Sequence, residues 1–143
     1  MITITVPTTG TGAQVDGYRP DLPEGIKGSN PEYSADYQTV TVTLPDTPEV
    51  EQWAVEQGYH VPARVTSGRF QIALKAKDAD VYAAVRQMID ADEDLALAAG
   101  EPYFNRGSTT IAALQAQLQS MGFSQVTDDW VDDVFRDAFL WDL

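Results

Sequence analysis

Two short segments near the start of the chain alternate apolar and hydroxyl residues. Residues 2–6 read Ile-Thr-Ile-Thr-Val and residues 39–44 read Thr-Val-Thr-Val-Thr-Leu, and a proline follows each of them. A period of two with β-branched residues is typical of a half-buried strand whose other face meets water. The sequence therefore predicts two strands that suit pairing with each other.

Beyond residue 46 the apolar positions recur at helical spacing. Five of the six predicted helices begin after a residue whose side chain caps helices well, and three end at a glycine. The strongest pattern follows Ser108 and runs from Ile111 to Met121 at intervals of 3, 4 and 3 residues. The other expected caps are Thr47, Thr66 or Ser67, Asp78 or Asp80, and Thr127. Residues expected to face the interior include Val50, Trp53, Ala54, Phe70, Ala73, Leu74, Val81, Ala84, Val85, Ile111, Leu114, Leu118, Met121, Val134, Phe135 and Ala138.

These patterns predict an α+β fold class with two parts. Residues 1–46 form a β-containing extension or arm, with a short β-hairpin-like pair of strands and a long loop rich in glycine and proline. Residues 47–143 form a helical domain, which we expect to be a compact bundle of about five or six short helices.

The long loop, residues 8–38, holds eight glycines and prolines together with Tyr18, Tyr33 and Tyr37. Loops of this length tend to be functional or to lie against something else. Two interpretations stay open: the loop is an arm that packs on a neighbouring chain, or it is an ordered meander on its own domain. On the first interpretation the isolated chain is incompletely stable or self-associating, because the loop holds few aliphatic residues to offset the cost of ordering.

The chain ends in a strongly apolar segment, Phe-Leu-Trp-Asp-Leu at residues 139–143. Such a segment is either the last strip of the core or an exposed anchor for another subunit. Aromatic residues supply contact area at interfaces, so the candidate partner-binding residues include aromatic residues of the loop and of this segment. They are Tyr18, Tyr33, Tyr37, Phe139 and Trp141.

The composition narrows the classes of function. The chain has 143 residues, with 9 lysines and arginines against 22 aspartates and glutamates, so its net charge is −13. The electrostatic field of this negative charge repels nucleic-acid phosphates and anionic lipid headgroups. We therefore expect neither nucleic acid nor a membrane as a partner. The chain has no cysteine and a single histidine, His60, which leaves little for nucleophilic catalysis or zinc binding. We therefore expect no enzyme activity, no cofactor and no metal.

Asp90, Asp92, Asp94 and Glu101 stand at positions 1, 3, 5 and 12 of a stretch that resembles a calcium-binding EF-hand loop. Position 6 of such a loop is glycine because the chain turns sharply there, whereas this chain has Leu95. The Leu-Ala-rich residues that follow favour a helix, so the stronger interpretation places these acids at a helix N-terminus.

The last predicted helix is rich in aspartate. Asp128 and Asp132, like Asp129 and Asp133, are like-charge pairs one helical turn apart, which destabilise an isolated helix. Burial of the apolar side chains between them can offset this cost. The aspartates then form a solvated face or, on a sharper interpretation, a surface that binds a basic partner or mimics DNA.

The order of motifs from residue 61 to about residue 140 resembles that of small proteins encoded in bacteriophage tail gene regions, near the tail-fibre and tail-tip genes. The shared order is a helix with an Arg-or-Gln/Ala-Leu motif, an amphipathic helix, an aromatic-x-Arg segment, an Ile-x-x-Leu helix, a glycine turn and an Asp-Asp-x-Phe helix. Here the motifs stand at Arg69 to Leu74, Val81 to Ile89, Phe104-Asn105-Arg106, Ile111 to Leu114, Gly122 and Asp132 to Phe135. The chain departs from the relatives at Gly107-Ser108, where they often have a proline turn, and at Met121-Gly122-Phe123, where they prefer Leu-Gly-Leu.

The resemblance implies a structural or accessory protein of a tailed-phage particle that binds fibre, baseplate or tail-tip subunits. The first residues carry no export signal, so we expect synthesis in the host cytoplasm and a final location in the virion tail. The alternative is a small acidic inhibitor, of the anti-restriction or anti-CRISPR type, that mimics DNA. The charge is spread along the chain, with 2 − 9 = −7 in residues 1–60 and 7 − 13 = −6 in residues 61–143, whereas a mimic needs its acids in one stripe.

Overall fold

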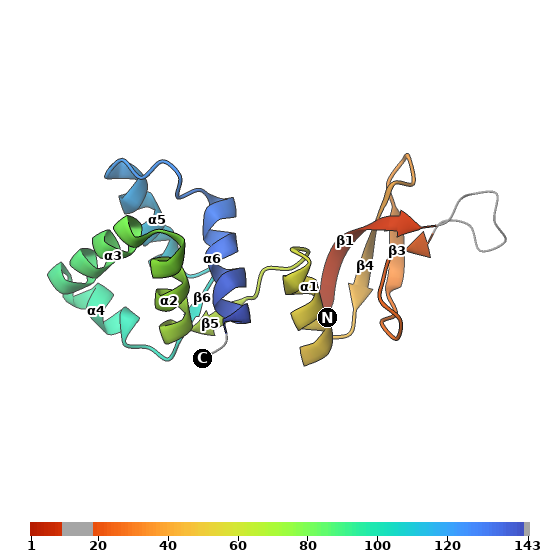
Figure 1. Cartoon of the computed structure of the whole chain (residues 1–143), viewed down its shortest axis with the longest axis horizontal. Coiled ribbons are helices and arrows are strands. Elements are labelled where there is room, and N and C mark those ends of the chain that lie inside the picture. The colour runs from red at the N-terminus through yellow and green to blue at the C-terminus, as the bar shows by residue number, and fades with distance from the viewer. Residues whose placement is uncertain (10–18, 142–143) are drawn as a thin grey trace. The chain divides into compact units, whose positions relative to one another are not determined.

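The computed structural model describes residues 1–9 and 19–141. It divides into two compact units, Met1–His60 and Val61–Leu143 (Figure 1). Each unit has its own hydrophobic core. The fold class is α+β, as predicted. The boundary lies after His60 and not after residue 46, because the first helix buries Val50 and Ala54 in the core of the N-terminal unit.

The N-terminal unit contains an antiparallel sheet with the strand order β2-β1-β4-β3. The two strands predicted from the sequence are confirmed as β1 (Ile2–Thr9) and β4 (Thr39–Leu44), and they pair along their length, with Ile4 opposite Val42. The strands β2 (Arg19–Pro20) and β3 (Ser29–Tyr33) flank this central pair. The sheet is therefore wider than the two-stranded ribbon that the sequence patterns predicted.

One face of this sheet is buried and the other is exposed to solvent. Ile2, Ile4 and Val6 of β1 are at most 5% exposed, whereas the threonines between them are exposed. Helix α1 (Pro48–Glu56) adds Val50 and Ala54 to the same core. The alternation of apolar residues and threonine thus produces the two-faced sheet that a period of two predicts.

The described part of the long loop packs on its own unit. Leu22, Ile26 and Tyr33 lie against the N-terminal core, and a Cβ atom at Gly28 would stand 2.9 Å from the Cβ atom of Val42. Such an approach leaves no room for a side chain at this glycine. Of the two interpretations left open above, the structure favours the ordered meander for residues 19–38.

The second unit contains the remaining helices and a short two-stranded sheet. Its helices are α2 (Ser67–Lys77), α3 (Ala79–Ala91), α4 (Glu93–Ala99), α5 (Thr109–Ser120) and α6 (Asp128–Leu140). The antiparallel strands β5 (Arg64–Thr66) and β6 (Tyr103–Asn105) were not predicted, because three residues are too few to display a period. Among the described residues, no helix has the length and apolar content needed to cross a membrane.

The helix boundaries follow the predicted signals. Side chains of Thr47, Thr66, Asp78, Ser108 and Thr127 accept hydrogen bonds from backbone N–H groups in the first turns of α1, α2, α3, α5 and α6. Each of these helices therefore begins where its cap residue predicted.

Helix α5 ends at Ser120, one residue before the end that its apolar pattern suggested, and Gly122 stops it as predicted. Gly122 adopts φ 100°, and Phe123 donates its N–H to the carbonyl of Leu118, which closes the helix in a Schellman motif. Phe123 then packs against the core, while Met121, expected inside, is 49% exposed. The prediction for Met121 was wrong because the chain leaves the helix at this residue.

Three phenylalanines from separate elements meet in the core of the helical unit. The ring of Phe70 on α2 lies 4.9 Å from that of Phe104 on β6 and 5.4 Å from that of Phe135 on α6, centroid to centroid. All three are at most 7% exposed. These contacts hold α2, α6 and the small sheet together.

We expect Phe135→Ala to lower the free energy of unfolding by about 3 to 5 kcal/mol, because it removes a fully buried ring from this cluster. The matched control is Leu97→Ala, whose side chain is 68% exposed and should contribute less than about 0.5 kcal/mol. Urea unfolding followed by far-ultraviolet circular dichroism measures both. Equal effects of the two substitutions would contradict the packing described here.

The cap of α3 should make stability depend on pH. A hydrogen bond from Gln125 and the backbone N–H groups of Val81 and Asp80 lower the pKa of Asp78 below its ordinary value of 3.8. A carboxyl group with a lowered pKa in the folded state stabilises the fold above its unfolded pKa, and this contribution is lost as the pH falls through the folded pKa.

We therefore expect Asp78→Ala to cost about 1 kcal/mol at pH 7, and this cost to shrink below pH 3.8. Asp80→Ala is the control, since the Asp80 side chain lies in the same turn but caps no helix. Thermal unfolding of both variants and the parent chain between pH 7 and pH 3 gives the comparison. A cost that stays constant over this range would show that the Asp78 carboxylate does not carry the effect.

Candidate functional site

Two of the predicted partner-binding tyrosines lie in the hairpin that β3 and β4 form, Tyr33 at the end of β3 and Tyr37 in the turn. The rings of Tyr33 and Tyr37 are 5.8 Å apart, centroid to centroid. Tyr33 packs against the N-terminal core, whereas Tyr37 is 49% exposed at φ 57°, a conformation that non-glycine residues adopt mainly in tight turns. Of the pair, Tyr37 has the ring that a partner can reach.

The hairpin that carries Tyr37 is fixed by a short polar network. The carboxylate of Asp36 accepts hydrogen bonds from the hydroxyl of Ser34, at 2.7 Å, and from the backbone N–H of Gln38, at 3.1 Å. These two bonds hold the pKa of Asp36 below its ordinary value. The turn is thus built to hold the tyrosine in one place.

The other three candidates are placed differently. Tyr18 lies outside the described residues. Phe139 and Trp141 are partly buried and pack against the core of the helical unit, so the apolar end of the chain is a strip of that core up to residue 141. Leu140, between them, is 40% exposed. Of the four candidates that the structure describes, Tyr33 and Tyr37 belong to the N-terminal unit and Phe139 and Trp141 to the helical unit.

Several aspartates of α6 have basic or amide partners within the helical unit. Asp133 forms ion pairs with Arg136, at 2.8 Å, and with Lys77, at 4.0 Å. The side chain of Gln115 donates a hydrogen bond to Asp128 at 2.9 Å. Part of the acidic face predicted from the sequence is therefore neutralised or hydrogen-bonded by the unit itself.

The strongest of these interactions joins Arg106, just after β6, to Asp132 on α6. The guanidinium Nε donates to the carboxylate at 2.6 Å, and Nη2 donates to the backbone carbonyl of Asp128 at 3.3 Å. Both side chains are about three-quarters buried, at 23% and 25% exposure. The guanidinium also lies 6.0 Å from the centre of the Phe135 ring, so Arg106 links the acidic and apolar faces of α6.

Sequence reasoning did not assign this role to Arg106. The aromatic-x-Arg and Asp-Asp-x-Phe motifs were recognised separately, and nothing in their spacing indicated that they pair. One signal was available in the sequence. Few basic residues stand near the aspartates of the last helix, so each nearby arginine is a candidate ion-pair partner for them.

Asp92, Glu93 and Asp94 lie at the N-terminus of α4, as the helix interpretation predicted, whereas Asp90 lies in the last turn of α3 and Glu101 follows α4. The Asp92 carboxylate accepts hydrogen bonds from the backbone N–H groups of Asp94 and Leu95, and so caps α4. Among the described residues, no three histidine, aspartate or glutamate side chains are grouped so that they could hold a metal ion.

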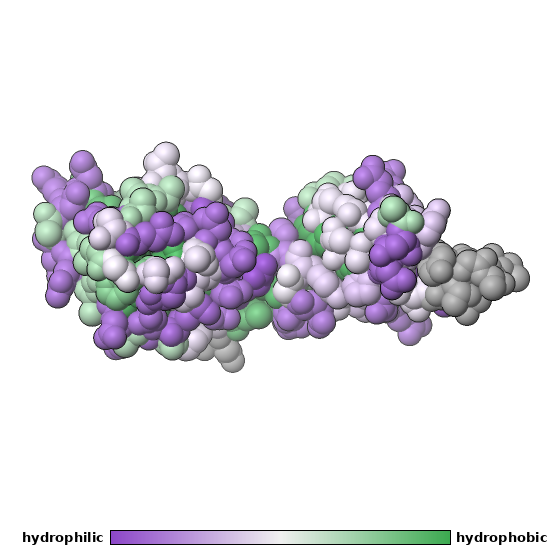
Figure 2. All heavy atoms as spheres, turned by 90° about the horizontal axis from the view of Figure 1, so that it is seen from above, coloured by the Kyte–Doolittle hydropathy of each residue, from purple (hydrophilic) through white to green (hydrophobic). Residues whose placement is uncertain are grey.

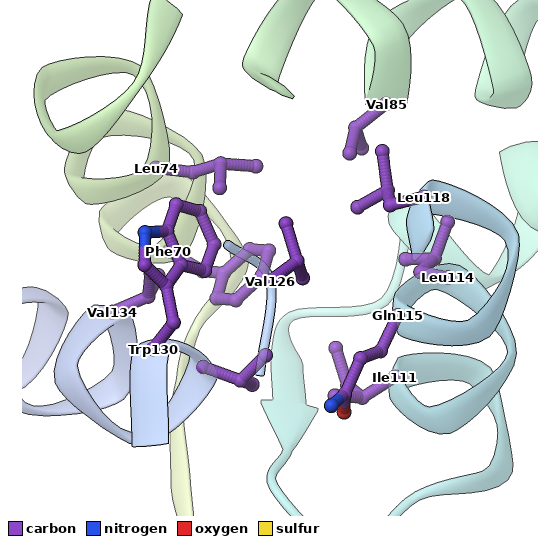
Figure 3. Close-up of a pocket in the computed structure, with 11 residues that line it drawn as sticks. Phe70, Leu74, Val85, Ile111, Leu114, Gln115, Leu118, Val126, Trp130 and Val134 are labelled. Atoms are coloured by element: carbon purple, nitrogen blue, oxygen red, sulfur yellow. The ribbon is translucent and has the colours of Figure 1, made fainter. Parts of the chain in front are cut away.

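A small apolar cavity of about 30 Å³ lies in the core of the helical unit (Figure 3). Phe70 and Leu74 of α2 and Trp130 and Val134 of α6 line one side, and side chains of α5 line the other. A space of this size holds about one water molecule, and among the lining side chains only Gln115 and the indole of Trp130 carry a polar group. The cavity is a gap in the packing and not a ligand site.

A larger open depression, of about 750 Å³, lies on the N-terminal unit. Arg19 and Lys27 line it together with Asp21 and Glu24, so its lining carries charges of both signs. Figure 2 shows hydrophilic residues over much of the visible face of each unit. Neither the depression nor this surface presents a constellation of catalytic groups among the described residues.

Comparisons of the chain with models of protein families, with curated proteins and with solved structures gave no match.

The ion pair of Arg106 and Asp132 should be energetically coupled. In a double-mutant cycle of Arg106→Ala and Asp132→Ala we expect a coupling free energy of about 1 to 2 kcal/mol, because the hydrogen bond is charge-assisted and mostly shielded from water. The pair of Arg136 and Asp133 is the matched control. Asp133 is 52% exposed, and the coupling there should stay below about 0.5 kcal/mol.

Urea unfolding at low and high salt measures both cycles. The coupling of the control pair should fall with added salt more steeply than that of Arg106 with Asp132. Equal coupling energies and equal salt dependence in the two cycles would contradict the role given to Arg106.

Proposed function

We propose that this chain is a structural or accessory protein of a tailed-phage particle, without enzyme activity, that binds fibre, baseplate or tail-tip subunits through protein–protein contacts. The resemblance of residues 61–140 to proteins of phage tail gene regions motivates the proposal. The helical unit is a packing module, and exposed residues of the two units bind the neighbouring subunits.

One observation carries the proposal: the motifs that make up the resemblance converge in one interior. Phe70, Phe104 and Phe135 each belong to a different motif, and their rings are in contact. Arg106 of the aromatic-x-Arg motif binds Asp132 of the Asp-Asp-x-Phe motif. The order and spacing of the motifs therefore have a physical reason, which is the shape of one core and the ion pair at its edge.

The structural roles of the motif residues also support a function in assembly over a function in catalysis. The motif positions are occupied by core side chains and by a structural ion pair, and the cavity between α2, α5 and α6 is lined by no carboxylate, histidine, lysine or arginine side chain. Exposed aromatic groups such as Tyr37 are the kind of side chain that contributes most to protein interfaces.

The alternative is the acidic inhibitor that mimics DNA. A mimic needs free carboxylates in one continuous stripe, whereas Asp132 and Asp133 on α6 are held by Arg106, Arg136 and Lys77. The negative charge is also divided almost equally between the two units. These observations make the inhibitor the weaker of the two candidates.

The test is the protein composition of particles. Phage particles or phage-derived tails from cells that encode the chain are purified by density gradient and digested, and the peptides are quantified by mass spectrometry. We expect the chain in a fixed ratio to the fibre or baseplate subunits, retained after a wash in high salt. An abundant non-structural protein of the same lysate is the control for adhering material.

Two other outcomes would overturn the proposal as stated. If the chain is absent from mature particles yet co-purifies with an unassembled fibre protein, it is an assembly chaperone. If it is absent from both and instead inhibits a host nuclease in a salt-sensitive and stoichiometric way, the inhibitor is the correct assignment.

A further inference from the structure

Among the residues that the structure describes, no strand pairs with the outer edge of β1 over residues 2–6. Within the described part of the N-terminal unit, β4 covers one edge of β1, and β2 covers the other only at Thr8 and Thr9. Residues 2–6 lie beyond the reach of β2. A strand edge of this kind presents unpaired backbone groups that can accept another strand.

The hydrogen bonds show which residues face outward. The N–H of Thr8 donates to the carbonyl of Gln38 next to β4, whereas the carbonyl of Pro7 accepts from Asp21 on the opposite side. Because the direction alternates along an antiparallel strand, the backbone groups of Ile2, Ile4 and Val6 point to β4. Those of Thr3 and Thr5 point away from the sheet, and among the described residues no partner for them is present.

We propose that this edge pairs with the same edge of a second copy of the chain, antiparallel and centred on Ile4. In this register Thr3 of one copy exchanges both backbone hydrogen bonds with Thr5 of the other. Two four-stranded sheets then become one continuous sheet across a two-fold axis.

The sequence of the edge is the reason to choose a second copy as the occupant. Ile-Thr-Ile-Thr-Val at residues 2–6 has the same pattern in both directions, so the two-fold register places apolar residues beside apolar residues and threonines beside threonines. The segment carries no charged side chain that would repel its copy across the axis.

Pro7 sets the limit of the pairing. This residue also faces outward, but it has no N–H to donate, and its carbonyl is already bonded to Asp21. A register shifted toward Pro7 therefore loses hydrogen bonds, and the register centred on Ile4 uses both outward threonines of each copy. The pairing does not depend on the function proposed above, because it rests on the N-terminal unit alone.

The first experiment is sedimentation equilibrium of the full chain from about 10 µM to about 1 mM. This range is high because an interface formed by one short strand pair is small, and small interfaces bind weakly. We expect the average mass to rise with concentration from 15.7 kDa toward twice that value. Thr5→Pro removes an outward N–H without removing a bond to β4, and should reduce the association at least tenfold. Thr5→Ala, which keeps the N–H, is the matched control and should associate like the parent chain.

The second experiment tests the register and does not rely on a proline variant that folds. The chain has no cysteine, so Thr3→Cys and Thr5→Cys each introduce a single thiol on the exposed face. In the proposed register the Cα atoms of position 3 in one copy and position 5 in the other are about 5.5 Å apart, within disulfide range. Two copies of the same variant place their thiols about 7 to 8 Å apart, outside it.

The two variants are mixed in equal amounts, with one of them labelled with ¹⁵N, and oxidised with glutathione. We expect the mixed disulfide to make up nearly all of the disulfide-linked dimer, against the half share that random collision gives. A statistical mixture of disulfides would overturn the register. A parent chain that stays monomeric at 1 mM, or a Thr5→Pro variant that is folded and associates unchanged, would overturn the pairing itself.

Discussion

Burial of the apolar side of α6 is the interaction on which the helical unit depends. Val131, Val134, Phe135 and Ala138 on this helix are all buried, and Phe135 is in contact with Phe70 on α2. The same helix carries aspartates one turn apart, which oppose helix formation in an isolated peptide. Tertiary packing and the basic side chains around it offset that repulsion, so α6 is a helix because of its surroundings more than its own propensity.

The N-terminal unit is stabilised in a different way from the helical unit, by β-branched side chains that are divided between the two faces of its sheet. Its sheet uses β-branched side chains on both faces, with isoleucine and valine inside and threonine outside. Thr5 and Thr41 share a hydrogen bond of 2.9 Å across the wet face, between neighbouring strands. The strands therefore keep their conformational preference without exposing an apolar surface to water.

Local signals made much of this fold predictable. Cap residues such as Thr47 and Ser108 act within one helical turn, and the period of β1 and β4 is visible in six residues or fewer, so the sequence alone was enough for these elements. Interactions between distant segments were not predictable. The boundary after His60, the strands β5 and β6, and the pairing of Arg106 with Asp132 all depend on which surfaces meet in three dimensions.

The capped helix starts have a consequence for how the chain folds. Asp78 and Asp92 each bind N–H groups two and three residues ahead, so these bonds form without any loop closure. The pairing of β1 with β4 instead joins residues separated by more than thirty positions. Contacts of short sequence separation form faster, and the turns of the helical unit are therefore expected to nucleate before the central strand pair closes, which gives the two halves of the chain different folding rates.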